Sequence, residues 1–504
     1  MKNELKIGSI LSIFSIILSS LISIFYTPMY MRYLGTTDYG INSLVQSIMG
    51  YIGMLNLGLG SAMVRYTVRY RTEGKLEEEK SLNGMFLLIF TIIMFISVAI
   101  GIYIYISLPN LFSDKFTIEE LEKTRQVFAI TMLGTALSFP VSVFSTNISS
   151  REKFLYQKAL GLLKLVLNPF IGALLMIKGY GLVAVVTTTI SLGIITNIFD
   201  IVYAFKVGMR LKFKDFDLKI LKDISKYSFY IFLNIIIDRV YWGTDRIIIG
   251  KFIGPTAVGI YSIASVFNNI YMNLSTAISG VLFPRINKMV VERKFNELSD
   301  MFIKVGRIQY ILLGLISSGF IIFGEEFIYL WLGQGYTEVY KVALWIVIPL
   351  TIPLIQNTGI AIMQARNQHQ FRSVVYFFIA MLNVITSILL VKNYGAIGCA
   401  IATGISFTLG NVIIINIYYW KRVDINIPLF WKNILKMSIP VIITMLIGTI
   451  SNSLLINYSV ITFIIKGFIY VIVYVILMWL LALNLEEKNE VKKLIGVKEN
   501  EFRV

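Results

Sequence analysis

Apolar runs of about 20 residues recur along this chain from Ile7 almost to Leu483. An α-helix needs about that length to cross the hydrocarbon core of a bilayer, which is about 30 Å thick. Lipid offers no partner to backbone N–H and C=O groups, so runs this long and continuous must be helices. Composition agrees, because 56% of the residues are apolar and only 15% are charged. The sequence therefore predicts an all-α polytopic membrane protein and excludes a soluble enzyme.

Hydropathy predicts fourteen membrane spans. They cover residues 7–31, 40–64, 82–107, 126–148, 159–177, 181–205, 228–250, 257–282, 304–324, 342–363, 373–391, 396–419, 434–455 and 460–483. The first span has no cleavage site of small residues behind it, and it exceeds the roughly 7–15 apolar residues of a secretory signal. We expect this segment to remain as a span.

Lys and Arg are distributed unevenly over the loops. If the N-terminus faces the cytoplasm, the inner segments hold 33 of these residues and the outer loops hold 8. By the positive-inside rule, this bias predicts a multi-pass protein of the plasma membrane with both termini in the cytoplasm. It also explains the excess of 46 basic over 29 acidic residues without nucleic acid as a partner.

Few residues are suited to bind a metal or to act as nucleophiles. The single cysteine is Cys399 and the single histidine is His369, so a disulfide framework and a cysteine metal site are excluded. No phosphate-binding loop of the form G-x-x-x-x-G-K-[ST] occurs, so ATP is not expected to drive the protein directly. The sequence predicts no metal, no cofactor and no catalytic residue.

Two turns of the chain share a pattern. Residues 32–40 read Arg-Tyr-Leu-Gly-Thr-Thr-Asp-Tyr-Gly and residues 251–259 read Lys-Phe-Ile-Gly-Pro-Thr-Ala-Val-Gly, so an offset of 219 aligns the basic residue and both glycines. Lys-Gly-Tyr-Gly at 178–181 likewise matches Lys-Asn-Tyr-Gly at 392–395. Spans 1–6 are therefore predicted to repeat as spans 7–12. Because six is even, this is a parallel repeat about an axis along the membrane normal.

The repeat divides the chain into predicted parts. These are an N-lobe with spans 1–6 (1–205), a cytoplasmic linker loop (206–227), a C-lobe with spans 7–12 (228–420), an appended pair of spans 13 and 14 (421–483) and a cytoplasmic tail (484–504).

With these features the chain resembles the polysaccharide-export flippases of the MOP (MATE-like) superfamily. Besides the spans, the resemblance rests on Tyr-Leu-Gly-Thr-Thr-Asp-Tyr-Gly at 33–40 and on Asp-Arg-Ile-Ile-Ile-Gly-Lys-Phe-Ile-Gly at 245–254, which runs into Val-Gly-Ile-Tyr at 258–261. It covers essentially the whole chain. It implies two lobes in a V around a central cavity, and alternating access that carries a polyprenyl-diphosphate-linked oligosaccharide outward for polysaccharide biosynthesis. The expected partners are the bilayer, this lipid and other polysaccharide-assembly proteins, and the expected oligomeric state is a monomer.

Span 7 carries more ionisable side chains than any other span, namely Asp238, Arg239, Asp245 and Arg246. Such groups cost about 2.5–3.5 kcal/mol each at a helix centre, so each is a candidate functional residue. Neither arginine has an acidic residue three or four positions away, so each needs a partner on another helix, in cavity water or in a bound anion. One interpretation is an ion pair with a neighbouring span. The other is a contact with the diphosphate, whose geometry suits the guanidinium fork.

Depth distinguishes the two arginines of span 7. Arg239 is the better candidate for the diphosphate because it lies deeper, whereas Arg246 lies near the span end, where a long side chain can snorkel to the interface. Asp238 and Asp245 are seven residues apart and therefore share one face of the helix, and Asn234 lies at the start of that face. Lys466 and Arg307 also lie near span ends and are expected to snorkel.

Polar residues in other spans add candidates. Lys164 in span 5 and Asp200 in span 6 should lie about 9 Å from the inner ends of their helices, and they are expected to form an ion pair, with cavity lining as the alternative. Gln46 in span 2 fits either a sugar hydroxyl or a neighbouring helix. Arg65, at the inner mouth, would either attract phosphate or serve only as one of the basic residues that set the membrane topology. The complete set of substrate-binding candidates is Arg239, Arg246, Asp238, Asp245, Asn234, Lys164, Gln46 and Arg65.

Two other functions remain open. A cation-coupled multidrug exporter of the same superfamily would use the carboxylates of span 7. A membrane-embedded polysaccharide polymerase or glycosyltransferase would gather catalytic groups on a long loop, and the longest outer loop, residues 108–125, carries acidic residues on a stretch typical of solvated surface. No loop is long enough for a catalytic domain, so the sequence favours a transporter that is not an enzyme.

Overall fold

The computed structural model describes residues 2–216, 218–280, 282–366, 368–454 and 459–494. Over these ranges the chain is almost entirely helical and contains no strand. Within the part of the chain that the structure describes, ten helical segments are long and apolar enough to cross a membrane, which confirms a polytopic all-α membrane protein. Two of the ten, residues 14–72 and 370–422, each cover two predicted spans in whole or in large part. The number fourteen stays a prediction.

The chain forms two compact units. The first comprises residues 1–266 and 376–402, and the second comprises residues 267–375 and 403–504. Their bounds differ from those of the predicted lobes, and the division into lobes stays a prediction. The predicted linker 206–227 is partly helical, because α7 (Leu218–Phe252) begins inside it. Hydropathy marks only the apolar core of a helix and does not register a polar first turn.

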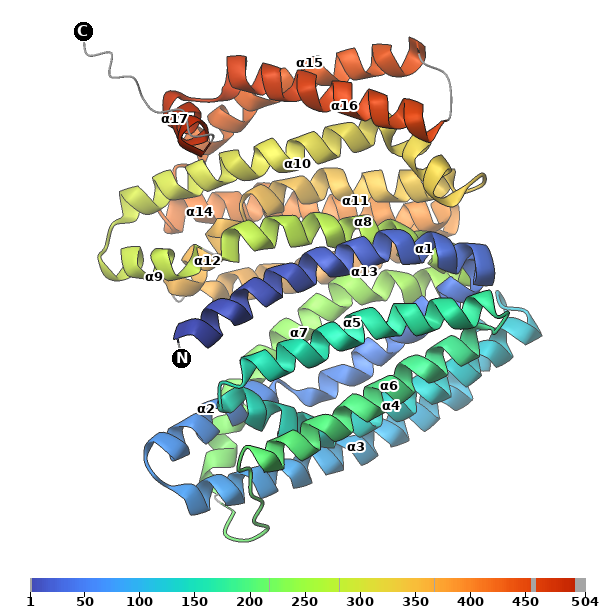
Figure 1. Ribbon diagram of the computed structural model, residues 1–504, viewed down its shortest axis with the longest axis vertical. Helices are drawn as coiled ribbons and strands as arrows, with labels where there is room; N and C mark the ends of the chain where they lie inside the picture. The colour runs from blue at the N-terminus through green and yellow to red at the C-terminus, as the bar shows by residue number, and fades with distance from the viewer. Residues whose placement is uncertain (1, 217, 281, 367, 455–458, 495–504) are drawn as a thin grey trace. The chain divides into compact units, whose positions relative to one another are not determined.

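The first unit is a layered bundle of long helices (Figure 1). Its elements are α1 (Lys2–Gly53), the short 3₁₀ helix η1 (Met54–Asn56), α2 (Leu59–Thr72), α3 (Leu76–Phe112), α4 (Ile118–Ser150), α5 (Phe154–Ile177), α6 (Leu182–Lys206), α7, the start of α8 (Pro255–Gly280) and the middle of α13 (His369–Phe407). α4 lies between α3 and α6, and α5 lies along α1. Phe86, Phe90 and Phe139 belong to the apolar core between these helices. Close packing of this kind, rather than exclusion of water, holds helices together in lipid.

Single glycines replace two of the predicted loops. α1 runs through the predicted loop after span 1, and Gly35 turns the chain there with a φ of 80°. α13 does the same at Gly395, with a φ of 59°. Glycine adopts positive φ without steric cost, so one residue suffices where the sequence suggested a turn of several.

The two repeated turns contact each other within the first unit. A side-chain carbon at Gly40 would overlap the carbonyl oxygen of Pro255, and one at Gly259 would overlap that of Thr36. Both glycines therefore serve a close approach of backbones, which any larger residue would prevent.

This contact is reciprocal. Adding 219 to 36 and 40 gives 255 and 259, so each copy of the turn presses the same positions against the other, as in an isologous interface. The hydroxyl oxygens of Thr37 and Thr256, which are also 219 apart, lie 2.9 Å from each other. The repeat inferred from the sequence is thus matched by a pseudo-symmetric contact.

The second unit also consists of helices (Figure 1). Its elements are the end of α8, α9 (Phe283–Val291), α10 (Phe295–Leu332), α11 (Thr337–Ile355), α12 (Asn357–Ala365), the start and end of α13, a π-helical stretch (Thr408–Ile415), α14 (Asn416–Arg422), α15 (Ile427–Leu454), α16 (Val460–Leu477), a second π-helical stretch (Met478–Ala482) and α17 (Leu485–Leu494). α10, α15 and α16 lie side by side.

The prediction that Arg307 snorkels is wrong. Its side chain is 5% exposed, and Nε donates to Glu487 Oε1 over 2.6 Å while Nη2 donates to Oε2 over 2.7 Å. Nη1 donates to Asn433 Oδ1 over 2.9 Å. Burial of the Glu487 carboxyl is the largest single effect and disfavours its charged form. The hydrogen bonds from Arg307 and from the Asn484 backbone N–H, together with the charges of Arg307 and Lys304, outweigh it and hold the pKa of Glu487 below its ordinary value. This bidentate pair fastens α17 to α10.

The same prediction is wrong for Lys466. Its side chain is 2% exposed, and Nζ donates to Glu326 Oε2 over 2.9 Å and to Asn452 Oδ1 over 3.0 Å. A buried cation with a carboxylate on a neighbouring helix avoids the cost of an isolated charge without reaching the interface. Lys466 therefore joins α16 to α10.

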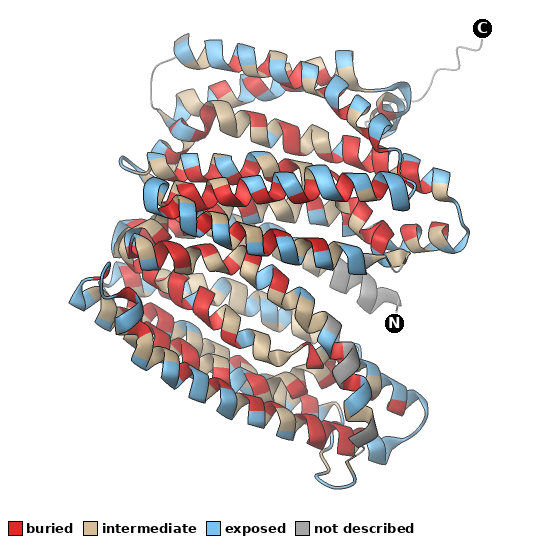
Figure 2. Ribbon diagram, turned by 180° about the vertical axis from the view of Figure 1, so that it is seen from behind, coloured by how far each residue is buried: buried red, intermediate tan, exposed pale blue. Residues whose placement is uncertain are grey.

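The exposed surface of the long helices is largely apolar. Figure 2 shows exposed positions running along the helices. Many of these positions hold large apolar side chains, including Phe95, Tyr103, Phe468 and Leu480. A surface of this kind faces lipid in a membrane protein and needs no other cover.

Candidate functional site

A cavity of about 510 Å³ opens among α1, α5 and α6 of the first unit. Its volume lies in the usual range for small-molecule sites. The apolar walls are interrupted by hydroxyl and amide groups and by the ammonium group of Lys164. The polar lining residues are Ser19, Ser23, Tyr26, Tyr30, Asn42, Gln46, Lys164, Asn168 and Thr189.

Two of the predicted candidates, Gln46 and Lys164, come together in this cavity. The expected ion pair between Lys164 and Asp200 is not formed, since no salt bridge reaches Lys164 from the described part of the chain. The two charges attract each other only from beyond contact distance. Equal depth, which the sequence predicted, does not by itself make two helices present facing side chains.

Three buried polar atoms of the cavity lining make no hydrogen bond of ordinary geometry among the described residues, although the side chains of Tyr30 and Asn42 lie close enough to interact with each other. They are Tyr30 Oη, Asn42 Oδ1 and Asn168 Oδ1. Tyr30 is 2% exposed. Buried polar atoms are partnered in the great majority of cases, and leaving one unpaired costs about 1–3 kcal/mol. Water or a bound molecule is therefore needed at Asn168 Oδ1, and it would also complete the hydrogen bonds of the Tyr30 and Asn42 pair.

The α1 helix places a polar stripe on the cavity. Ser19, Ser23, Tyr26 and Tyr30 recur at steps of four, three and four residues, which is the spacing of one helix face. The hydroxyls of Ser19 and Ser23 donate to carbonyl groups one turn earlier and keep their oxygen lone pairs as acceptors. Hydropathy does not reveal this stripe because it lies inside an apolar run, although its period is readable in the sequence.

Arg239 lies one helical turn beyond the cavity lining. Nη1 of Arg239 is 3.0 Å from the position that a side-chain carbon on Gly50 would take. Gly50 follows Gln46 by four residues on α1, or about 6 Å along the axis. No ion pair or side-chain hydrogen bond reaches the Arg239 guanidinium from the described residues of its unit. This cation is thus exposed beside the cavity and suited to bind an anion.

The backbone of Arg239 is held in place by Tyr51. Tyr51 Oη donates to the Arg239 carbonyl oxygen over 3.3 Å, and it also forms a short hydrogen bond with the Thr244 hydroxyl. These contacts fix α7 against α1. The position of the guanidinium is therefore set by the fold and does not depend on an acidic partner.

Asp245 and Arg246 take part in contacts between helices. Asp245 is 2% exposed, and its carboxylate accepts from Tyr261 Oη over 2.6 Å and from Ser387 Oγ over 2.9 Å. Arg246 Nε donates to Ser262 Oγ over 3.0 Å, so this side chain is held by a neighbouring helix. The structure does not place these two candidates in the cavity lining.

The remaining candidates lie elsewhere on the first unit. Asn234 and Asp238 are exposed on α7, and Arg65 is exposed on α2. None of the three lines the cavity. The structure therefore brings Lys164 and Gln46 together, puts Arg239 one turn away, and separates the other candidates from them.

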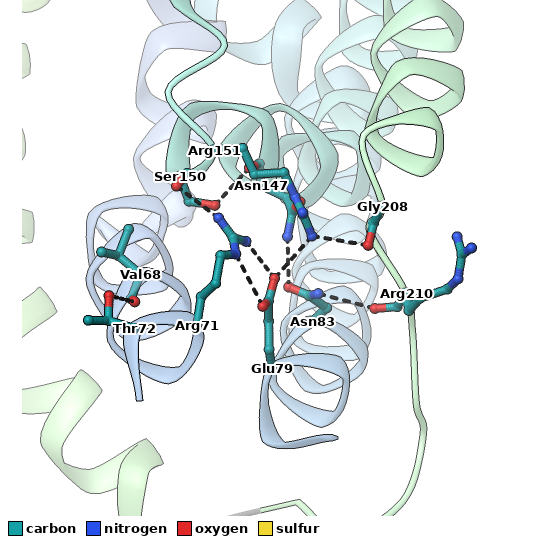
Figure 3. A network of polar contacts seen from close by, with 10 residues as sticks. All are labelled: Val68, Arg71, Thr72, Glu79, Asn83, Asn147, Ser150, Arg151, Gly208 and Arg210. Carbon is teal, nitrogen blue, oxygen red and sulfur yellow. Dashed lines mark hydrogen bonds and ion pairs between the residues drawn. The ribbon is translucent and has the colours of Figure 1, made fainter. Parts of the chain in front are cut away.

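A second polar cluster lies where α2 and α4 end and α3 begins (Figure 3). Glu79 is 4% exposed, and its carboxylate accepts from Arg71 Nη2 over 2.5 Å and from Arg151 Nη2 over 3.1 Å. Arg71 Nη1 also donates to the Ser150 carbonyl oxygen over 3.0 Å, and Arg151 Nη2 to that of Gly208 over 3.1 Å. These donors are engaged within the protein, so the cluster joins helices and a loop and offers no site.

Removing the Glu79 charge should destabilise the first unit. Glu79→Gln leaves two partly buried arginines facing each other without their shared carboxylate, and we expect a loss of about 3 kcal/mol in the free energy of unfolding. Thermal unfolding in detergent measures this. Glu78→Gln, at the exposed neighbouring position, is the control. Equal unfolding temperatures for both variants would contradict the structural role of the cluster.

Comparisons with known proteins agree with this architecture. The family described as polysaccharide biosynthesis protein matches residues 5–290, which is more than half of the chain. The probable flippase AglR of Haloferax volcanii is 30% identical over 200 residues, and the match covers 38% of this chain and 41% of that relative. The chain thus spans less than half of the length of this relative.

Two solved structures share the fold. The lipid II flippase MurJ, in an inward closed conformation, superposes with a TM-score of 0.75 and 19% identity over 97% of this chain and 99% of that one. An inward-facing multidrug resistance MATE transporter of the MOP superfamily superposes with a TM-score of 0.64 and 16% identity over 82% and 96%. At such identities the likeness concerns the fold alone. On the match over residues 5–290, the chain belongs to the polysaccharide biosynthesis protein family.

Proposed function

We propose that this protein is a flippase that carries lipid-linked oligosaccharides across a membrane for polysaccharide biosynthesis. The family match and the relative named as a probable flippase support this. The observation that carries the proposal is the polar cavity within apolar helices, with unpartnered hydrogen-bonding atoms and with Arg239 one turn away. A cargo with a polar head and an apolar tail needs such a polar path through the bilayer interior.

The residues of the site suggest how the cargo is handled. Arg239 binds the diphosphate through its planar fork, which matches phosphate oxygens in pairs. The hydroxyl and amide groups of the cavity replace water around the sugar, while the polyprenyl tail stays in lipid. The inside-negative potential favours outward movement of an anionic head by about 2.3 kcal/mol per charge per 100 mV. Transport by alternating access then needs no ATP.

The orientation in the membrane is part of the proposal. The bias of basic residues supports a plasma-membrane protein with both termini in the cytoplasm. Lys178 and Lys214 are exposed between helices and suit single-cysteine labelling in a Cys399→Ala background. A cysteine at 178 should react with an impermeant reagent in intact cells, and one at 214 should react only after permeabilisation. The reverse pattern would overturn the orientation.

Reconstitution tests the function itself. Vesicles with the purified protein should expose a fluorescent lipid-linked oligosaccharide to an impermeant reagent or glycosidase faster than vesicles without protein. Deletion in the source cell should lower surface polysaccharide and accumulate lipid-linked intermediates. Movement of a cationic drug with no movement of the lipid would instead establish the multidrug exporter.

A further inference from the structure

We propose that the cavity among α1, α5 and α6 recognises an acidic sugar of the cargo, and that Lys164 selects it by binding the sugar carboxylate. This inference rests on the proposed flippase function and deepens it, because it names the class of oligosaccharide that is carried. It separates the sugar site from the diphosphate site at Arg239.

The hydrogen-bonding character of the cavity fits a sugar and not a diphosphate. Asn42 Oδ1 and Asn168 Oδ1 are acceptors only, and neither accepts a hydrogen bond of ordinary geometry from the described residues, although Asn42 lies near Tyr30. A fully ionised diphosphate presents acceptors only, so it would leave these two oxygens unpaired. Sugar hydroxyls donate as well as accept, so they can satisfy both amide oxygens and Tyr30 Oη.

The ring surfaces of the cavity fit the same ligand. Tyr26 and Tyr30 both line it, and the centroids of their rings lie 6.0 Å apart in an edge-to-face arrangement. The ring of Tyr26, which is half-buried, offers apolar contact beside polar groups, as the C–H faces of a sugar ring require, whereas the ring of Tyr30 is buried. The volume of about 510 Å³ holds one part of an oligosaccharide rather than a whole repeating unit with its diphosphate.

The charge of the cavity decides the kind of sugar. Lys164 is half-buried, and no ion pair reaches it from the described residues. Asp200 attracts it from beyond contact distance but does not line the cavity. A cation in an apolar surrounding is costly without a counterion, so a bound anion gains strongly there. A ligand with hydroxyl donors and a carboxylate on one ring is a uronic acid or a similarly acidic sugar.

Two matched cargoes test the inference in vesicles. They share the polyprenyl diphosphate and the glycan, except that one carries glucuronate where the other carries glucose. The wild-type protein should flip the acidic cargo about tenfold faster, the effect of one hydrogen bond to a charged group. Lys164→Gln should bring the ratio of the two rates close to one, and Lys164→Arg should keep most of it. Lys158→Gln, on the same helix outside the cavity lining, should keep the ratio of the wild type.

The outcomes separate this inference from the proposed function. If the wild type flips both cargoes at equal rates, the acidic-sugar inference is overturned and the flippase function stands. If it flips neither cargo, the proposed function fails. Preference for the acidic cargo that persists in Lys164→Gln, or that disappears equally in Lys158→Gln, removes Lys164 from the selection. The wild-type ratio remains decisive if Lys164→Gln does not fold.

Discussion

A disulfide between positions 37 and 256 should stop transport almost completely. The hydroxyl oxygens of Thr37 and Thr256 lie 2.9 Å apart, so cysteines there fall within the reach of a disulfide. In alternating access the two repeats must separate on one side of the membrane, and these residues lie where the two turns meet. Oxidised Thr37→Cys/Thr256→Cys, in the Cys399→Ala background, should flip no lipid-linked oligosaccharide above the protein-free rate.

Reduction provides the control within the same sample. Adding a reductant should restore flipping to the rate of the background protein, because both side chains are small and the backbone contact is unchanged. Each single-cysteine variant should be insensitive to oxidant. A fully cross-linked double variant that flips at the unmodified rate would show that this contact stays closed throughout transport.

This contact shows what an internal repeat in a sequence does and does not predict. The offset of 219, which aligns Gly40 with Gly259, is readable from the two turns, whereas the need for glycine there is not. The sequence indicated only a local turn at each position. In the structure these two glycines allow the backbones of two distant segments to touch. Periodicity reports that two segments are alike, whereas their contact depends on how the repeats are folded against each other.

The buried charges show a second limit. Arg307 and Lys466 were assigned to the interface because they lie near span ends, yet each is buried on a carboxylate 180 or 140 residues away in the sequence. Position within a helix predicts depth, but the energy of a buried charge depends on the partner that another helix supplies. The same limit explains Lys164, whose depth suggested Asp200 as a partner while its face is directed to the cavity.

The cavity itself was predictable in part. Lys164 and Gln46 stood out as polar residues inside apolar spans, and both line it. Tyr26 and Tyr30 did not stand out, because a tyrosine in an apolar run is commonly an ordinary packing residue. Only their spacing with Ser19 and Ser23 distinguishes them from packing residues. That spacing can be recognised as one wall of a cavity only when the positions of α5 and α6 are known.

Replacing Arg239 with alanine should abolish flipping while the protein remains folded. No acidic side chain among the described residues depends on this arginine, so its loss strands no counter-charge of the kind that destabilises a broken buried pair. The loss falls on the cargo, whose diphosphate no longer has a cation to offset its desolvation. Flipping of a lipid-linked oligosaccharide in vesicles measures the activity, and thermal unfolding in detergent should match that of the wild type.

Arg239→Lys should retain part of the activity, because the charge survives while the bidentate fork is lost. Arg246 provides the contrast, because its guanidinium is held by Ser262 and by the Trp242 carbonyl oxygen. Arg246→Ala should lower the unfolding temperature along with any loss of flipping. Arg239→Ala should thus lose activity and keep its stability, whereas Arg246→Ala should lose stability. This contrast would separate cargo binding from helix packing on α7. Full flipping by well-folded Arg239→Ala would instead require another cation to meet the diphosphate, and would remove Arg239 from the transport path.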